Sequence, residues 1–576
     1  MRKYNKLIIW ALAVIGVSLS SCDDIFEKLA VNPNQQDVSS FYNTPENINK
    51  GVVGIYSYIT TPRAMGVSAT RLMANRGDES SDRTDYGVPG QYNASLTSSW
   101  YTIVQPYQLF YTAASQACQM IEVIPDVEFS NEKLKNAYLG EAYFLRAFSH
   151  WFLFLNFRNI PLMEHFPKSS KDYKPQSAPE DTWDFIISDL KKAKELLPKK
   201  GFWTGDNIGR VTSAAATALL GKAYLYRSGI EKYYGNSSTT YYDEAAACFD
   251  EIIKGDHGDY KLMANYNDNF RVATENNDES ILEFQFLGDA VNTGFNPGMP
   301  ESGVWRDPRG NQPPSLISNN AHVIHQWVYD TFVASKDKNG KTDSRMFGTL
   351  IFDDTAAEIH AKQGDKVTVF DGRSFNDYYY AEKGGVVTKG FAIVSSQAGN
   401  YKSACRKNID WTLPSKNPGN NMWIGNLRAN GLNYTYIRYA DVLLMYAEAV
   451  VSGGKQGKLT ALEAVNEVRA RPSVNMPALA SVDMAAIEHE RILELTQEGH
   501  RFYDLLRWGK VAERFAELDA IDPNFKQYNT SAYLGFQKGR DEWLPIPIDE
   551  VEGNPYITEL NSTCKCNRIL INNLFK

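Results

Sequence analysis

The chain has 576 residues, a formal net charge of -8 and a sequence pI near 5.7. This acidic balance excludes the basic footprint of a nucleic-acid-binding protein and disfavours a polyanionic partner. Length alone would allow three or four domains, but no Pro-rich or Ser/Gly-rich linker divides the sequence, so we expect one compact body. Aromatic residues make up 12%, with tyrosine the commonest, which is typical of surfaces that stack on sugars or peptides.

The N-terminus has the order of charge and hydrophobicity found in bacterial secretion signals. Basic residues at positions 2, 3 and 6 precede an apolar run over 7–19 that is too short to span a membrane comfortably. The run ends in Leu19-Ser20-Ser21-Cys22, the pattern that bacterial lipoprotein processing enzymes recognise. The sequence therefore predicts a signal peptide over 1–21 and lipidation of Cys22, whose acyl chains would be the membrane attachment.

Five cysteines follow Cys22, an odd number that does not indicate a disulfide framework. Cys118 and Cys248 occupy apolar helical positions and are expected in the core. Cys564 and Cys566 are separated by one residue, which strains a direct disulfide, so pairing of either with Cys405 stays open.

Apolar residues recur at a spacing near 3.6 in eight segments, which predicts a mainly helical frame over about 40–280 and 434–556. The predicted helices cover 101–124, 134–157, 182–197, 214–226, 242–253, 439–451, 459–469 and 485–508. Pro125, Pro161 and Pro198 follow the first three and are expected to end them, and Ser213 can cap the start of the fourth.

Two segments repeat the first-helix pattern of tetratricopeptide repeats, Leu139-Gly140-x-x-Tyr143 and Leu220-Gly221-x-x-Tyr224. Ala245-x-x-x-Phe249 matches the second-helix pair, and a degraded third copy lies at 444–465. Small residues at the Gly and Ala positions let two helices approach closely. We therefore predict tetratricopeptide-like helix pairs that form a right-handed scaffold, and such a surface often docks another protein.

The composition changes over 281–433 to Gly, Asn, Asp and Pro, with scattered aromatics and short β-type runs at 367–370 and 386–394. This segment is expected to be an irregular, loop-rich insertion on the helical frame. Loops carried by a rigid scaffold are where binding residues concentrate.

Several longer motifs carry a family resemblance. They are Gly140-Glu141-Ala142-Tyr143-Phe144-Leu145-Arg146-Ala147, the stretches 156–161, 209–212 and 437–449, then 490–495 continuing through 498–509, and Leu544-Pro545-Ile546-Pro547. On these motifs the chain resembles the SusD/RagB family of Bacteroidetes outer-membrane nutrient-binding lipoproteins over nearly its whole length. The tail after Asn554-Pro555 departs from the usual family ending.

The resemblance implies a single SusD-like body over 22–576 and a SusC-like TonB-dependent transporter as partner. Asp23 and Asp24 directly follow Cys22 and resemble the surface-export signal of Bacteroidetes lipoproteins. The expected location is the outer membrane, with the lipid-anchored protein facing the cell exterior.

The charged cluster at 490–507 could be interpreted as the carboxylate pair of a surface glycosidase. A general acid needs a carboxyl group whose pKa is raised, whereas arginines interspersed at helical spacing keep these carboxylates ionised. The cluster therefore predicts a structural ion-pair network, and no hydrolase or nucleotide motif such as G-x-S-x-G or a Walker loop occurs. The protein is expected not to be an enzyme.

His322-x-x-His325 has the spacing of two metal ligands on one helical turn, but no third ligand completes a set. The stretch 337–343 is similar to a calcium loop yet lacks its final glutamate, so a turn before Asp343-x-Arg345 is expected instead. We predict no metal and no cofactor.

Glycan capture needs flat aromatic faces for the sugar rings and polar side chains for their hydroxyl groups. Two segments, 75–100 and 295–309, supply both. The candidate ligand residues are Asp78, Arg83, Tyr86, Tyr92, Phe295, Asn296, Trp305 and Arg306. Trp100 begins a predicted helix and is expected to pack in the core.

These observations predict a cell-surface protein that captures an oligo- or polysaccharide and delivers it to the transporter. Peptide capture by a RagB-like subunit is the alternative within the binding class. A surface glycosidase and a tetratricopeptide scaffold without a small ligand are the other classes considered.

Overall fold

The computed structural model describes residues 41–557 except 67, 83–84, 91, 93–95, 170–171, 287–321, 353–359, 361, 364–379, 384–385, 390–402, 408–430, 523–524 and 526–534. The protein is mainly helical with short strands, as predicted. The helices are α4 (Pro45–Ile59), α5 (Ser68–Asn75), α6 (Tyr101–Val123), α7 (Glu132–Phe157), α8 (Pro179–Leu196), α9 (Ser213–Tyr234), α10 (Tyr242–Lys254), α11 (Gln326–Ala334), α12 (Arg345–Thr349), α17 (Tyr439–Val451), α18 (Ala461–Arg469), α19 (Met484–Leu495), α20 (Arg501–Arg507), α21 (Val511–Ile521) and α23 (Ile548–Gly553).

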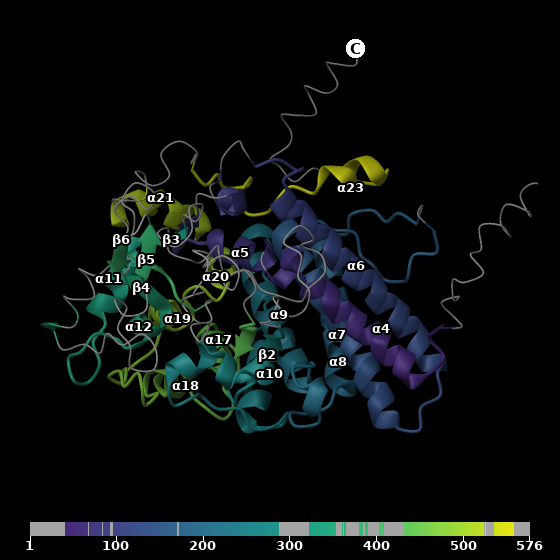
Figure 1. The fold of residues 1–576 in the computed structure, drawn as a ribbon, viewed down its shortest axis with the longest axis horizontal. Coiled ribbons are helices and arrows are strands. Elements are labelled where there is room, and N and C mark those ends of the chain that lie inside the picture. The colour runs from purple at the N-terminus through teal and green to yellow at the C-terminus, as the bar shows by residue number, and fades with distance from the viewer. Residues whose placement is uncertain are drawn as a thin grey trace, which may run out of the picture.

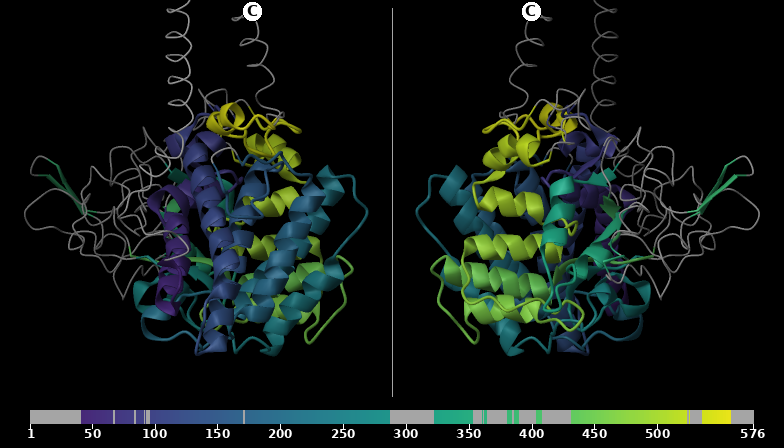
Figure 2. Two further views of the ribbon diagram at one scale, coloured as in Figure 1. Left: turned by 90° about the vertical axis from the view of Figure 1, so that its right-hand side faces the viewer. Right: turned by 90° about the vertical axis from the view of Figure 1, so that its left-hand side faces the viewer.

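The long helices pack against their neighbours in a continuous series. α4 contacts α6, and the contacts then run through α7, α8, α9, α10, α17 and α18 in turn. Figure 1 shows α4, α6, α7 and α8 side by side, and the right panel of Figure 2 shows the green to yellow helices stacked above one another. Their buried apolar residues form one cluster from Ile48 to Ile557. Tetratricopeptide geometry in detail stays a prediction.

Two glycines set the spacing of adjacent helices. A Cβ atom on Gly140 of α7 would lie 2.9 Å from Leu197 Cγ, which follows α8. A Cβ atom on Gly221 of α9 would lie 2.8 Å from Phe249 Cε1 of α10. Both distances are shorter than carbon atoms tolerate, so the prediction that these positions need a very small residue is confirmed.

Most predicted helix ends are correct within three residues, but α9 runs to Tyr234, eight residues beyond the predicted end at 226, and its start also needs a correction. Thr212 is the residue before the first turn, and Ser213 is already inside the helix. The Ser213 hydroxyl lies 2.9 Å from His257 Nδ1 and does not cap the helix. The prediction of a Ser213 cap is therefore wrong, because a tertiary partner holds the hydroxyl.

The predicted helix at 485–508 is two helices in the structure. α19 ends at Leu495, and α20 begins at Arg501. Between them Gln497 and Gly499 have φ angles of 65° and 79°, which no α-helix contains. The amide and side-chain nitrogens of Gln497 donate to Glu79 Oε1 at 3.0 and 3.1 Å. Apolar spacing runs across this break, so periodicity alone could not locate it.

The described strands form four antiparallel two-stranded ribbons. They pair β1 (Ser80–Asp82) with β3 (His322–Ile324), β2 (Ser280–Phe284) with β8 (Tyr434–Arg438), β4 (Leu350–Phe352) with β7 (Ser403–Cys405), and β5 (Tyr380–Lys383) with β6 (Val386–Lys389). β6 confirms the start of the predicted run at 386–394, and the run at 367–370 lies outside the described residues. The β2–β8 ribbon holds together the two ends of the loop-rich segment 281–433.

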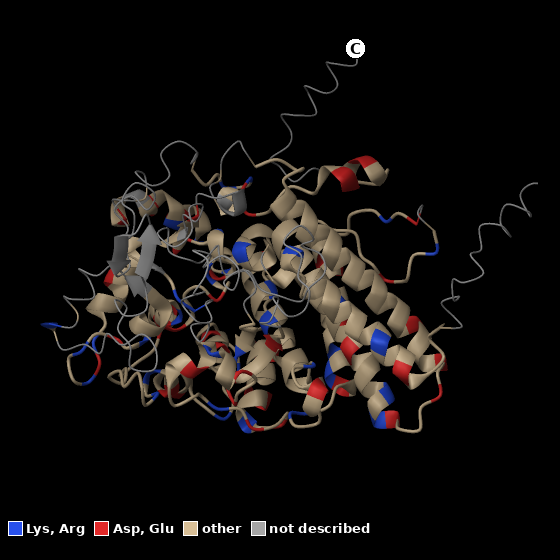
Figure 3. Ribbon diagram, in the orientation of Figure 1, with Lys and Arg blue, Asp and Glu red and all other residues tan. Residues whose placement is uncertain are grey.

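Acidic and basic residues lie interspersed along the helices drawn in Figure 3. In the described part of the chain no helix combines the length and the apolar character that a membrane span requires. Cys118, Cys248 and Cys405 are buried, as expected for the first two, whereas Cys564 and Cys566 lie outside the described residues.

Candidate functional site

The β1–β3 ribbon pairs the strand inside the first predicted ligand segment, 75–100, with the strand that follows the second, 295–309. Asp82 pairs with His322, and the antiparallel register continues through Ser80 and Ile324. The last residue of β1 therefore lies beside the first residue of β3 at one end of the ribbon. This pairing joins residues more than two hundred positions apart in the sequence, and periodicity did not predict it.

Asp78 lies just before β1 and is fully buried. Its carboxylate accepts from Arg501 Nε at 2.7 Å and from Arg514 Nε. Burial alone would raise the pKa of Asp78, but the two guanidinium groups outweigh it and lower the pKa to about 2. The carboxylate is therefore ionised and fixes the base of the segment, out of reach of a ligand at the surface. This corrects the expectation of direct ligand contact.

Tyr92 is also buried, with 2% of its surface exposed. Its hydroxyl donates to the carbonyl oxygen of Arg76 at 2.6 Å, and its ring makes edge contacts with Phe515 and Phe536 at 5.0 and 5.1 Å. Tyr92 thus anchors the segment to the helical frame near α21 and does not present its ring to solvent. The burial of Tyr92 therefore also corrects the expectation that its ring stacks on a sugar.

The other predicted ligand residues have no described side chain. Tyr86 lies in a short 3-10 helix, Asp85–Gly90, whose side chains at 85–87 are not described. The remaining five, Arg83, Phe295, Asn296, Trp305 and Arg306, lie outside the described residues. Trp100 is partly buried and packs against the core, as expected.

Trp327 is an aromatic residue at this base that the sequence patterns did not single out. Its indole Nε1 donates to the carbonyl oxygen of Asp78 at 2.7 Å, and the Arg514 guanidinium carbon lies 4.3 Å from its ring centroid. The ring remains partly exposed beside β3. The sequence feature that could have identified Trp327 is its place two residues after the His322-x-x-His325 motif, at the start of helix α11.

His325 is fully buried. Its Nε2 lies 2.7 Å from the hydroxyl oxygen of Ser81, and its Nδ1 lies 2.6 Å from the carbonyl oxygen of Asp78. Both ring nitrogens therefore hold the β1 segment in place. The stretch at 337–343 forms the expected turn, in which the Asp337 carboxylate accepts from the amides of Asn339 and Lys341.

Glu79 is buried behind β1 and is the most perturbed acid of the site. Its Oε1 accepts from Gln497, whereas its Oε2 has no hydrogen-bond partner among the described residues. Burial raises the pKa of Glu79 to about 8, and the neighbouring Asp78 carboxylate adds to the increase. Glu79 therefore carries a proton at neutral pH inside the frame.

A buried ion cluster ties the loop-rich segment to the helices. It consists of Glu279, Arg345, Arg438, Arg471, Glu490 and Glu494. Arg345 Nη1 lies 2.6 Å from Glu490 Oε1 and 2.8 Å from Glu494 Oε2. Burial would raise the pKa of Glu494, but the surrounding guanidinium groups outweigh it and lower the pKa. The predicted ion-pair network is confirmed, and the guanidinium groups lower the pKa of both Glu279 and Glu494, which holds these two carboxylates ionised.

Comparison with known proteins gives a consistent result along the chain. The model of the SusD family matches residues 231–563, and a model described as starch-binding associating with outer membrane matches residues 29–225. A SusD-like protein of Bacteroides ovatus is 24% identical, over 97% of this chain and 93% of its own. SusD-like protein P2 of Formosa agariphila is 24% identical, over 96% and 98%.

Solved structures share the fold. A SusD homolog from Bacteroides thetaiotaomicron superimposes with a TM-score of 0.69 at 21% identity, over 91% of this chain and 98% of that chain. Surface glycan-binding protein A from the same species, in complex with laminarihexaose, gives a TM-score of 0.65 at 19% identity, over 90% and 99%. Because the family model matches more than half of the sequence and the fold agrees, the chain belongs to the SusD family.

Proposed function

We propose that this protein captures an oligo- or polysaccharide outside the cell and passes it, uncleaved, to a SusC-like TonB-dependent transporter in the outer membrane. The observation that carries the proposal is the register of the β1–β3 ribbon, because it joins the first aromatic segment, 83–95, to the strand that follows the second, 295–309, in the sequence. We expect two segments that connect to one ribbon to contact one ligand together. Trp327 adds a partly exposed ring at the same base.

The base is rigid enough to position such loops. Asp78, Tyr92 and His325 are buried and bonded to the helical frame, so the loops leave a fixed platform. Fixed starting points reduce the ordering cost of binding. Membership of a family whose relatives include a laminarihexaose-bound surface glycan-binding protein supports a glycan over a peptide as the ligand.

Trp305 is the residue with which we test the proposal. We expect Trp305→Ala to weaken glycan binding at least tenfold, about 1.4 kcal/mol, because stacking on the sugar face is lost. Its melting temperature should stay close to that of the wild type, since a loop residue supports little of the core. Glycan arrays identify the ligand, and calorimetric titration with a melting curve measures both effects. Phe202→Ala, which removes an aromatic side chain that is 38% exposed elsewhere, is the matched control.

Three outcomes would contradict the proposal. Binding of peptide mixtures in place of glycans would assign the protein to the peptide-capturing class. Release of reducing ends during incubation with the bound glycan would make it an enzyme. A large fall in the melting temperature of the Trp305 variant with unchanged affinity would place the ligand elsewhere.

A further inference from the structure

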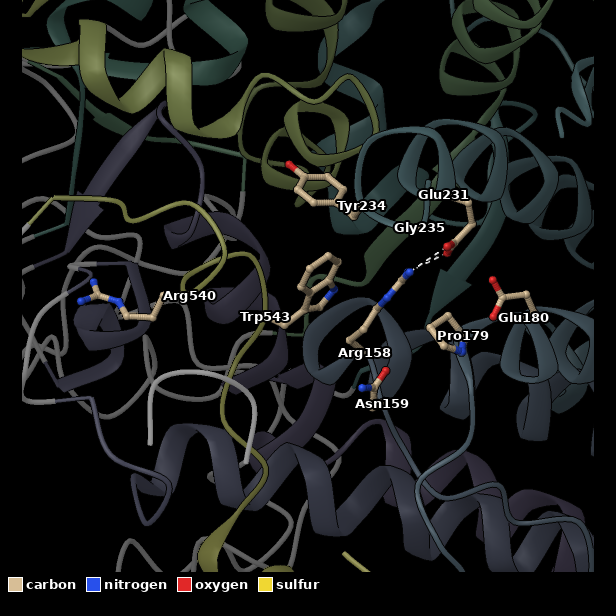
Figure 4. Close-up of a pocket in the computed structure, with 9 residues that line it drawn as sticks. All are labelled: Arg158, Asn159, Pro179, Glu180, Glu231, Tyr234, Gly235, Arg540 and Trp543. Atoms are coloured by element: carbon tan, nitrogen blue, oxygen red, sulfur yellow. Dashed lines mark hydrogen bonds and ion pairs between the residues drawn. The ribbon is translucent and has the colours of Figure 1, made fainter. Parts of the chain in front are cut away.

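A polar cavity lies between the end of α7, the start of α8, the end of α9 and residues 540–543, next to the segment of Tyr92, because Arg540 Nη2 donates to the carbonyl oxygen of Tyr92 at 3.5 Å. Its volume is about 440 Å³, within the range of small-molecule sites. Figure 4 shows Tyr234 and Trp543 on one side of the Arg158 guanidinium group and Glu180 on the other. We call this cavity the α7–α9 pocket.

The positive charges of the arginine side chains that line the pocket are already neutralised by carboxylates. The Arg158 guanidinium group donates to both carboxylate oxygens of Glu231, at 2.6 and 2.7 Å, and Trp183 Nε1 donates to the same carboxylate at 2.6 Å. Arg540 is paired with the Asp541 carboxylate in the same way, at 2.7 Å. An anionic ligand would therefore compete with carboxylates that these guanidinium groups already hold.

The backbone of Arg158 has a conformation that is unfavourable for a residue with a side chain. It follows the last residue of α7 with φ 60° and ψ -82°, a combination outside the allowed regions for a residue with a Cβ atom. The bidentate contact with Glu231 and the packing of the guanidinium group over Phe154 and Trp543, at 5.3 and 5.0 Å from their ring centroids, maintain it. Strain that the surroundings maintain in this way gathers at ligand sites.

The rest of the lining offers aromatic surface and unused polar groups. Tyr234 and Trp543 contact each other edge to face at 5.2 Å, and both are partly exposed. Trp543 Nε1, the Asn159 side-chain amide and the Glu180 carboxylate make no hydrogen bond or ion pair with any residue in the described part of the chain. The pocket thus presents a hydrogen-bond donor in Trp543 Nε1, a group that both donates and accepts in the Asn159 amide, and an acceptor in the Glu180 carboxylate. All three lie beside an aromatic ring.

We propose that the α7–α9 pocket binds one neutral sugar unit, as a glycan contact in addition to the loops on the β1–β3 base. The partly exposed rings of Tyr234 and Trp543 suit the C–H face of a sugar, the unused polar groups suit its hydroxyl groups, and the neutralised guanidinium groups together with Glu180 disfavour an acidic sugar. This inference rests on the proposed capture of glycans. The experiment therefore follows both sites in one sample.

The chain contains eleven tryptophans, so labelling with 5-fluorotryptophan gives a fluorine NMR signal for each. Trp543→Phe and Trp305→Phe assign the two signals of interest by their disappearance. The full-length protein is titrated with the methyl glycosides of glucose, galactose and mannose, with laminarihexaose, and with methyl glucuronide as the charged control. We expect the Trp543 signal to move saturably with at least one neutral probe and at least tenfold more weakly with methyl glucuronide.

The variants Asn159→Ala and Glu180→Gln, combined, test the polar groups without touching an ion pair. They should weaken the Trp543 response at least tenfold and leave the Trp305 response unchanged. A Trp543 signal that stays still while the Trp305 signal moves overturns the second site and leaves the proposed function standing. Signals that both stay still with every probe overturn the two proposals together. Stronger binding of methyl glucuronide overturns the neutral-sugar class.

Discussion

Arg345 shows how a single side chain connects the loop-rich segment to the helices. Its guanidinium group is fully buried and contacts Asp343, Glu490 and Glu494. Because these carboxylates are buried, removal of the arginine leaves negative charges without compensation.

We therefore expect Arg345→Met to lower the free energy of unfolding by about 3–5 kcal/mol. Urea titration monitored by circular dichroism measures the change. Lys261→Met is the control, since Lys261 pairs with Asp278 at 3.1 Å with side chains that are 74% and 49% exposed, and should cost at most about 1 kcal/mol. Equal losses in the two variants would show that the buried cluster contributes no more than a surface pair.

Glu79 should make stability depend on pH in an unusual direction. Its folded pKa is about 8 against an ordinary value of 4.5, so between these values the folded chain holds a proton that the unfolded chain has lost. The stability that Glu79 contributes is present below pH 4.5 and is lost as the pH rises through 8. Glu79→Gln resembles the protonated acid and does not titrate.

We therefore expect the stability advantage of Glu79→Gln over the wild type to grow between pH 4.5 and 8, by at most about 1.4 kcal/mol per pH unit. Melting curves across this range measure it. Glu195→Gln, at an exposed position on α8, should show no such trend. An advantage that shrinks as the pH rises would mean that Glu79 is ionised in the folded protein.

The break between α19 and α20 is the element on which the base of the loop site depends. Gly499 has φ 79°, and a Cβ atom there would lie 2.6 Å from the Tyr434 hydroxyl oxygen and 3.2 Å from Met73 Cβ. Gln497 in the same break holds Glu79 behind β1. Helix α19 must therefore end at this break so that Gln497 can bond Glu79, which precedes β1.

We expect Gly499→Ala to destabilise the protein by about 1–3 kcal/mol, because a side chain is both strained and crowded at this position. Gly54→Ala is the control, since a Cβ atom on Gly54 of α4 would meet nothing within 4 Å. That change should be neutral or stabilising by up to about 1 kcal/mol. Thermal unfolding of both variants compares them, and a loss of the same size at Gly54 would refute the argument.

Sequence periodicity predicted the helical elements well because each long helix buries one apolar face against the next. α6, α7, α10 and α17 begin and end within two residues of the expected positions. Periodicity missed the break after Leu495, because apolar spacing is kept while the backbone turns. The sequence also predicted that Asp78 and Tyr92 are exposed to a ligand. Composition indicates which side chains suit a sugar, but it does not indicate which of them a distant arginine or aromatic ring will bury.

At the scale of the whole molecule, attachment to the membrane is predicted to depend on Cys22. We expect Cys22→Ala to leave the outer-membrane fraction, because the acyl chains are the attachment that the sequence provides. Fractionation after a high-salt wash, followed by immunodetection, measures the distribution. Cys118→Ala, a buried core substitution, is the control and should stay with the membrane. Retention of the Cys22 variant would require another means of attachment.

The buried ion cluster also constrains the order in which the chain can mature. Glu279 is neutralised by Arg471, which lies 192 residues later in the sequence. A polypeptide that emerges N-terminus first completes α4 to α10 from near neighbours, whereas the segment from β2 onward waits for partners at 438–494. We therefore expect the helices α4 to α10 to form before Glu279 finds Arg471, so that the buried ion cluster is completed late in folding.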